Sequence, residues 1–262
     1  MAFTNSSLVD YTLISPSKSS RNGHTIDTIT IHCVAAQAAV ETLGRLFQTK
    51  QASSNYGIGS DGRVGMYVEE KDRSWCSSNG DNDCRAVTIE VASDNTHPYA
   101  VNAKAYAKLL DLVTDICKRN GIKKLVWSTN KSDRINHKNG CNMTVHRDYA
   151  NKACPGDYLY NRHGQIAAEV NKRLEEEDMA RYKTLDEIPK GYQAETKELM
   201  ELGFNGKGGD AGLDVTEDML RTMIVNLRMC KAMMAALPDN SIDKTALFAE
   251  FKKNLKLTIA VE

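Results

Sequence analysis

The chain lacks several features that would place it in common functional classes. Its 34 Lys and Arg residues are balanced by 34 Asp and Glu residues, so no net charge draws it toward nucleic acid or an anionic membrane. No uninterrupted apolar run approaches the ~18 residues of a membrane-spanning helix. The opening stretch MAFTNSSLVDYTLI has no basic segment followed by an apolar one. We therefore expect a chain synthesised in the cytoplasm without a signal peptide and without a membrane span.

A disulfide framework is also missing from the sequence. The seven cysteines are odd in number and scattered along 262 residues, which favours reduced thiols over a disulfide scaffold. Cys76 and Cys84 flank the polar loop SSNGDND. They are the one close pair for which the sequence leaves oxidation open.

The sequence does contain an alternation of strand and helix patterns. Three segments are typical of strands: TIDTITIHCV (25–34), AVTIEV (86–91) and KKLVW (123–127). Asp61-Gly62 between two extended segments predicts a hairpin. Residues 102–120 carry an apolar stripe at helical spacing. These patterns predict an α/β fold with a mixed central β-sheet flanked by helices.

Length and a change in composition predict two domains. Residues 1–174 hold the alternation of strands and helices, and the charged run that follows suggests a linker at 175–183. Residues 184–262 have Met-rich helical patterns around the glycine-rich segment FNGKGGDAG. We expect this last part to form a small helical C-terminal module.

The stretch VHRDYANKACPGDYLY (145–160) combines residue types that metal chemistry uses. A catalytic zinc site takes nitrogen or thiolate ligands from three residues and keeps one position for water. His146 and Cys154 supply two such ligands, and His32, near the end of a predicted core strand, is the best candidate for the third. The sequence therefore predicts one Zn²⁺ bound by three side chains.

Each of these residues also has an interpretation without catalysis. A single histidine in a strand is more often a core residue with satisfied hydrogen bonds, and a single cysteine is usually a small buried hydrophobe. A structural zinc site would close with four protein ligands. Cys33 and Cys141 are both chemically suitable as the fourth, so the ligands alone do not separate a catalytic site from a structural one.

Four motifs carry a resemblance to a known family: TIHCV, SSNYGIG, VTIEVASDN and VHRDYANKACPGDY. Together they resemble the zinc-dependent N-acetylmuramoyl-L-alanine amidases of the type-2 amidase and peptidoglycan-recognition-protein superfamily, especially the endolysins of phages and prophages. The resemblance covers about residues 20–172. Because four motifs occur in the same order, the resemblance is highly specific.

The resemblance implies a hydrolase that cuts bacterial peptidoglycan between N-acetylmuramic acid and L-alanine, acting on the cell wall after release. The zinc ligands of the family correspond here to His32, His146 and Cys154. Tyr56 and Lys152 match the tyrosine and lysine that serve catalysis in the phage enzymes. Glu90 falls where several bacterial members carry a catalytic glutamate, although other members have no acid there.

The chemistry of these side chains suits amide hydrolysis. Lys152 would stabilise the developing oxyanion, and Tyr56 could orient the water or donate to the same oxygen. Glu90 could act as general base or as an outer partner of a ligating histidine. The alternative function is a non-catalytic peptidoglycan-binding module of the same fold. Binding-only members typically lack the cysteine ligand, which this chain retains as Cys154.

The C-terminal part has a weaker resemblance of its own. The stretch from RYKTLDEIPKGY to MIVNLRM is similar to the tail module of some clostridial-type phage amidases and, more distantly, to an S-layer-homology repeat. The acidic segment DVTED suits a helix N-terminus through the helix dipole. Two partners stay open for this module, namely the cell wall and a second copy of the chain bound through the Met-rich face.

Overall fold

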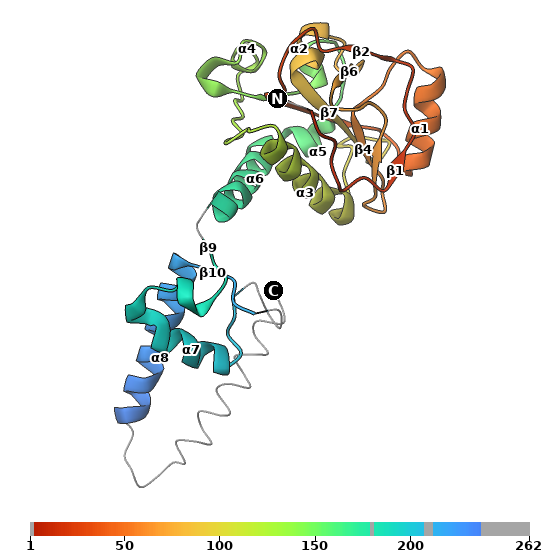
Figure 1. The fold of residues 1–262 in the computed structure, drawn as a ribbon. Coiled ribbons are helices and arrows are strands. Elements are labelled where there is room, and N and C mark those ends of the chain that lie inside the picture. The colour runs from red at the N-terminus through yellow and green to blue at the C-terminus, as the bar shows by residue number, and fades with distance from the viewer. Residues whose placement is uncertain (1–2, 179–180, 207–211, 237–262) are drawn as a thin grey trace. The chain divides into compact units, whose positions relative to one another are not determined.

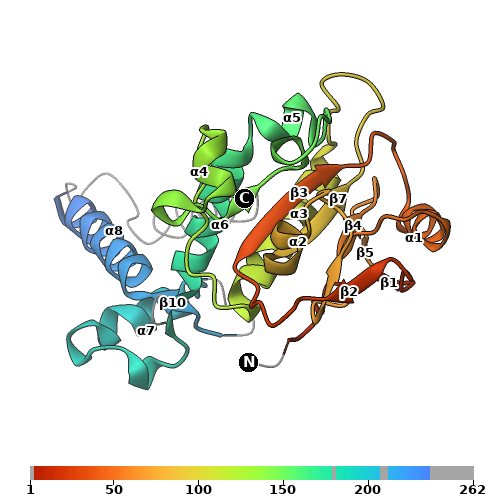
Figure 2. The ribbon, with the colours of Figure 1, turned by 90° about the horizontal axis from the view of Figure 1, so that it is seen from above.

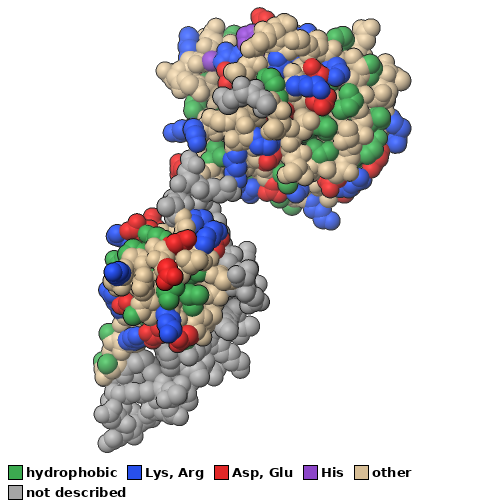
Figure 3. Space-filling view, viewed as in Figure 1, with side chains coloured by type: hydrophobic (Ala, Val, Ile, Leu, Met, Phe, Trp, Pro, Cys, Tyr) green, Lys and Arg blue, Asp and Glu red, His purple; other side chains and the backbone are tan. Residues whose placement is uncertain are grey.

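The computed structural model describes residues 3–178, 181–206 and 212–236. Contacts within the chain divide it into two compact units, Met1–Glu176 and Glu177–Glu262 (Figure 1). The end of the predicted C-terminal module, from residue 237 onward, lies outside the described residues. On the visible face of the first unit, basic and acidic side chains are interspersed (Figure 3), as the balanced composition predicts.

A six-stranded mixed sheet forms the centre of the first unit. Its spatial order is β1 (Tyr11–Thr12), β5 (Val64–Met66), β4 (Tyr56–Ile58), β7 (Ala86–Val91), β3 (Thr28–Cys33) and β8 (Met143–Thr144). Neighbouring strands run parallel except β4 and β5, which form the predicted antiparallel hairpin. Gly62 in its turn has φ +85°, which explains the glycine there. The predicted α/β class with a mixed central sheet is confirmed.

The two faces of this sheet differ in chemistry because side chains alternate along each strand. The parallel register pairs Ile31 with Ile89 and His32 with Glu90. The two isoleucines therefore share one face, and His32 and Glu90 share the other. The isoleucine face joins a large core with three helices: α3 (Ala103–Arg119), α5 (Gly156–Tyr160) and α6 (His163–Asp178).

Helix α3 follows the sequence prediction closely. Asn102 caps its N-terminus by accepting a hydrogen bond from the Ala105 N–H at 2.9 Å, a cap commonly worth ~1 kcal/mol. The helix buries Leu109, Leu112 and Ile116 in the core. It ends just before a glycine with positive φ at position 121, so local sequence signals set both of its ends.

The opposite face of the sheet carries polar side chains beneath the predicted site. Thr30 and Thr144 share a hydrogen bond of 2.7 Å between their hydroxyls. Asn82 on α2 (Gly80–Arg85) donates to Thr30 Oγ1 at 3.1 Å and accepts from Thr144 Oγ1 at 2.8 Å. Helix α1 (Val40–Thr49) lies near the β1 edge, and the helices α4 (Lys131–Ile135), α5 and α6 lie on the side of β3 (Figure 2). This hydrogen-bonded layer supports β3 and β8, the strands that lead to the candidate ligands.

The segment KKLVW, predicted as a strand, forms none. The Leu125 N–H donates to Asn171 Oδ1 at 2.7 Å and the Val126 N–H donates to Asn142 Oδ1 at 2.8 Å. Side-chain amides thus take the backbone hydrogen bonds that a neighbouring strand would otherwise satisfy. Hydrophobic periodicity and composition do not reveal that side-chain amides take the place of a neighbouring strand.

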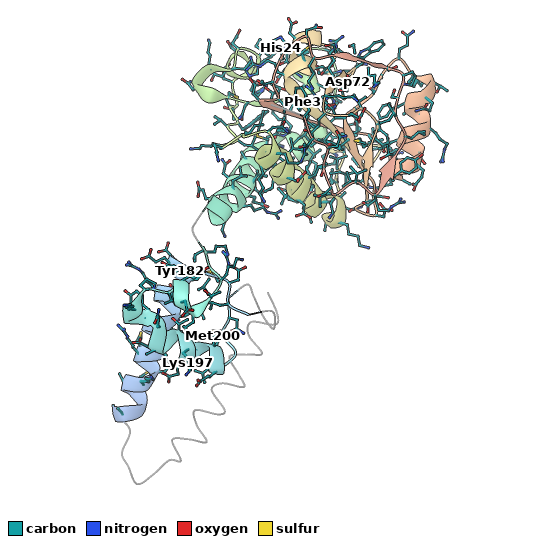
Figure 4. All side chains as sticks on the ribbon, viewed as in Figure 1. Phe3, His24, Asp72, Tyr182, Lys197 and Met200 are labelled. Atoms are coloured by element: carbon teal, nitrogen blue, oxygen red, sulfur yellow. The ribbon has the colours of Figure 1, made fainter. Side chains whose placement is uncertain are left out.

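The second unit is small and mostly helical. A short antiparallel pair, β9 (Arg181–Tyr182) and β10 (Val215–Thr216), accompanies α7 (Gln193–Glu201), α8 (Glu217–Ala236) and the 3-10 turns η3 (Leu185–Glu187) and η4 (Lys190–Tyr192). Its own core includes Leu199, Val215 and Ile224, with Tyr182 and Met200 packed against it (Figure 4). None of the helices in the described ranges combines the length and apolar character that crossing a bilayer requires.

The stretch expected to be a linker, 175–183, differs from that expectation. Helix α6 continues to Asp178, and β9 begins at Arg181. Glutamate has a high helix propensity, so a run of glutamates extends a helix rather than ending it. At the start of α8, Thr216 Oγ1 accepts from the Met219 N–H at 3.2 Å, so the segment DVTED does begin a helix.

Candidate metal centre

Three donor side chains meet near the carboxyl ends of β3 and β8. His32 lies in β3, His146 opens the turn η2 (His146–Asp148) directly after β8, and Cys154 precedes α5. Nδ1 of His32 lies 3.3 Å from Sγ of Cys154, and the two histidine rings are 5.1 Å apart between centroids. One ligand atom from each of the three residues lies within 4.8 Å of the others. The structure thus brings the three predicted ligands together.

The protonation of the histidines suits metal binding. Burial, followed by the neighbouring His146, lowers the pKa of His32 to about 3. His32 is therefore neutral near pH 7 and keeps a nitrogen lone pair. Burial and then the positive charge of Lys152 lower the pKa of His146. Nε2 of His32 is buried and has no hydrogen-bond partner among the residues described.

The donor set fits zinc with an open position. Two imidazoles and one thiolate are ligands that zinc prefers. His146 and Cys154 are only half-buried, so the group is accessible from one side. Within the described ranges, neither Cys33 nor Cys141 belongs to this group of donor atoms. Cys141 instead contacts the carbonyl of Met143, and three ligands are the number typical of a catalytic zinc site.

Glu90 faces the same site from the neighbouring strand. One of its carboxylate oxygens, one nitrogen of His32 and the sulfur of Cys76 lie within 4.8 Å of one another. The Cys76 thiol donates to Glu90 Oε1 at 3.9 Å, while Oε2 is buried and has no partner in the described part of the chain. Burial raises the pKa of Glu90 to about 8. Glu90 therefore lies next to His32 with one oxygen available for a proton or a water.

Two further residues lie at the site that the sequence patterns do not indicate. Ser78 Oγ and His146 Nε2 lie 3.0 Å apart, a hydrogen bond between positions 68 residues apart in the chain. Cys76, which touches Glu90, comes from the same loop. Neither residue belongs to a recognisable spacing, and Cys76 and Cys84 do not pair, since both are free thiols.

A buried ion pair supports the turn that carries His146. Arg134 on α4 (Lys131–Ile135) donates through Nε to Asp148 Oδ2 at 2.8 Å and through Nη2 to Oδ1 at 2.5 Å. Their side chains are 2% and 1% exposed, and the guanidinium lies 4.5 Å over the Trp127 ring. Such bidentate pairs fix geometry as well as charge. Asp148 closes η2, so this pair orients the backbone that positions His146.

Lys152 extends from the loop between His146 and Cys154. Its side chain is exposed, and none of the described residues gives it a hydrogen bond or an ion pair. Its charge nevertheless reaches His146, whose pKa it lowers. A free ammonium group therefore lies near the ligands, where a substrate carbonyl could meet it.

Tyr56, the other predicted catalytic residue, does not lie with this group. The register pairs it with Ile89, so its side chain lies on the isoleucine face of the sheet, away from His32 and Glu90. Its fully buried hydroxyl donates to Glu70 Oε1 at 2.7 Å and accepts from the Ser6 N–H at 2.9 Å. Burial, followed by the Glu70 charge, raises its pKa well above the usual range. We correct its expected role to a structural one.

We expect the Tyr56→Phe variant to lose stability and keep its turnover. Removing the hydroxyl leaves the Ser6 N–H without its acceptor, which should cost about 1–2 kcal/mol. Urea unfolding measures this cost, and amide hydrolysis by the same preparation measures turnover. Tyr67→Phe is the matched control, because Tyr67 is also fully buried and its hydroxyl donates to the Val40 carbonyl at 2.7 Å. A large loss of turnover in folded Tyr56→Phe, absent from Tyr67→Phe, would restore the catalytic role.

Sequence comparison identifies the family. A profile of the N-acetylmuramoyl-L-alanine amidase family, Amidase_2, matches residues 22–157, which is more than half of the 262-residue chain. The chain belongs to this amidase family. The part of the amidase that matches includes all three candidate ligands, Glu90 and Lys152. No curated protein sequence matches the chain.

Solved structures give distant matches to this amidase. PlyL is 16% identical, with 62% of this chain and 96% of that chain covered and a TM-score of 0.45. A mutant endolysin from Bacillus subtilis is 15% identical, with coverages of 62% and 99% and a TM-score of 0.44. The N-acetylmuramoyl-L-alanine amidase LysC from Clostridium intestinale URNW is 16% identical, with coverages of 62% and 95% and a TM-score of 0.45.

Proposed function

We propose that this chain is a zinc-dependent peptidoglycan hydrolase that cleaves the amide bond between N-acetylmuramic acid and L-alanine. The observation that carries the proposal is the convergence of His32, His146 and Cys154, open on one side, in a chain of the amidase family. Zinc bound by these residues would activate a water as nucleophile and polarise the scissile carbonyl.

The surrounding side chains would handle charge and protons. The free ammonium of Lys152 would stabilise the negative charge that develops on the carbonyl oxygen. In its ionised form, Glu90 would take a proton from the attacking water at its unpartnered Oε2 and pass it to the leaving amine of L-alanine. The same oxygen could instead accept the Nε2–H of His32, which would orient that ring.

We also propose that the hydrolase is a phage or prophage endolysin that reaches the cell wall after release. Support comes from the four sequence motifs, which are most similar to those of such enzymes. The second unit would then bind the wall or join two copies of the chain. On α8, Val225, Met229 and Met233 are exposed at intervals of four residues. They lie on one face of the helix, through which two copies of the chain would associate.

The bond that is cleaved can be tested on purified peptidoglycan. We expect digests to gain free L-alanine amino termini without a gain in reducing sugar ends. A bound zinc would polarise the carbonyl of an amide, and a glycosidic bond has no carbonyl. Labelling of amino termini with mass analysis, beside a reducing-sugar assay, measures both. A gain in reducing ends alone would refute the proposal.

The alternative, a binding module without activity, gives a different result in the same assay. The protein would sediment with peptidoglycan and release no new amino termini. The retained thiol ligand and the free lysine beside the site argue for catalysis over this alternative. A zinc-loaded preparation that binds walls and leaves them uncut would favour the binding module.

A further inference from the structure

An open pocket lies directly beside the metal centre and has no role so far. Its volume is about 410 Å³. Its walls come from the start of α4, the turn η2 and the loop that follows, and they include Lys131, Arg147, Asp148, Tyr149 and Lys152. Arg147 follows His146 in the chain, and its N–H donates to the Cys154 carbonyl at 3.2 Å, so the wall of the pocket adjoins two of the candidate ligands.

The charges of the pocket are not balanced. Asp148, its one acidic residue, is neutralised by the buried Arg134. Arg147 shares its charge with Asp157 at 3.2 Å, but its Nε is buried and has no partner among the described residues. Lys131, like Lys152, is exposed, and the described part of the chain offers it neither an ion pair nor a hydrogen bond. The pocket therefore presents two uncompensated ammonium groups and favours an anion.

We propose that this pocket is a carboxylate-binding subsite for the stem peptide, with Lys131 as the residue that contacts the carboxylate. The inference rests on the proposed function, which defines the two halves of the substrate. The N-acetylated glycan half is uncharged at the bond to be cut, since its lactyl carboxyl forms the amide. The peptide half keeps free carboxylates beyond its L-alanine, and these are the anions that suit the pocket.

The subsite also orients the substrate. Lys152, in the loop between two ligands, would serve the scissile carbonyl, whereas Lys131 lies on α4 and would meet a group farther along the chain of the substrate. The peptide would then lie over η2 and the start of α4, and the glycan would leave the metal in the other direction. Lys131 thus affects binding and leaves the chemical step unchanged.

Paired synthetic substrates test this subsite in the zinc-loaded, full-length protein. One pair is muramoyl-L-Ala-D-Glu and the same molecule with its second-residue α-carboxylate amidated. A second pair differs only by amidation of the carboxylate on a third residue. We expect Lys131→Ala to raise KM about 10-fold for the free-carboxylate member of one pair and to leave KM for the amidated member of that pair unchanged. For both members, kcat should stay within about twofold of the value for the unaltered protein. The pair that responds identifies which carboxylate is bound.

Lys138→Ala is the matched control, because Lys138 is an exposed lysine close to α4 in sequence that does not line the pocket. The proposal fails if Lys131→Ala changes KM equally for free and amidated members, or if Lys138→Ala has the same effect. Calorimetry with the free peptide L-Ala-D-Glu-L-Lys separates this outcome from failure of the proposed function. Loss of about 10-fold affinity in Lys131→Ala would support the subsite even without turnover, and equal affinity in both proteins would overturn it.

Discussion

Cys154→Ala protein should purify as a folded chain with almost no bound zinc and with amide hydrolysis reduced by roughly 1000-fold or more. Cys154 is the only thiolate in the three-residue donor group of the described chain. Two imidazoles alone bind zinc weakly, and a site without the ion loses both the activated water and the polarised carbonyl. Metal content measured by mass spectrometry, together with turnover on muropeptides, tests both parts of this expectation.

Two other cysteines provide the controls for this variant. Cys141 is 1% exposed and points to the carbonyl of Met143, so Cys141→Ala should keep the zinc. Cys33 neighbours Cys154 without joining the donor group, so Cys33→Ala should keep it as well. Loss of zinc from either variant would indicate a closed site with four protein ligands, which is structural. Full zinc and activity in Cys154→Ala would show that the ligand assignment is wrong.

Local sequence signals predicted much of the fold because they act through the chain itself. The strand at 86–91 has the same bounds in the structure as in the sequence pattern, and α3 (Ala103–Arg119) lies within the helix predicted over residues 102–120. The β4–β5 hairpin follows from Asp61-Gly62. In each case, neighbouring residues determine backbone geometry, so periodicity and turn chemistry are sufficient.

The residues of the site could be predicted only where they belong to a recognisable motif. His32 lies 122 positions before Cys154 in the chain, and the resemblance to a family identified it together with His146 and Cys154. The structure contributes what no motif recorded, namely the contact of Ser78 with His146 and the buried pair of Arg134 and Asp148. These contacts depend on tertiary packing, which leaves no regular spacing in the sequence.

Tyr56 shows why a motif position alone does not define a role. Its segment is a strand in both the prediction and the structure, but the face that its side chain occupies depends on the register of β4 against β7. A shift of one residue would move a side chain to the opposite face. Since the register pairs Gly57 with Glu90, the tyrosine next to that glycine points into the core.

Lys152→Ala should lower kcat by roughly 100-fold to 1000-fold, the usual consequence of losing one oxyanion donor. Zinc content and melting temperature should stay near those of the unaltered protein, because the lysine is exposed and none of the described residues bonds to its side chain. KM should change little, in contrast to Lys131→Ala, in which we expect KM to rise and kcat to hold. Steady-state kinetics on one muropeptide, with both variants beside Lys138→Ala, separates these effects.

The comparison of these lysines distinguishes transition-state stabilisation from a general positive field. If the field alone mattered, removing any of the three charges would weaken binding by an amount that falls with the distance of that charge from the substrate, and added salt would reduce every effect. Removing a specific oxyanion donor lowers kcat even at high salt, because the charge that the donor meets appears only in the transition state. Near-normal kcat in folded, zinc-loaded Lys152→Ala would show that Lys152 is a solvated loop lysine without a catalytic role. Glu90, which lies beside His32 with an unpartnered oxygen, would then be the remaining side chain to assist the metal, and Glu90→Gln should show the larger loss.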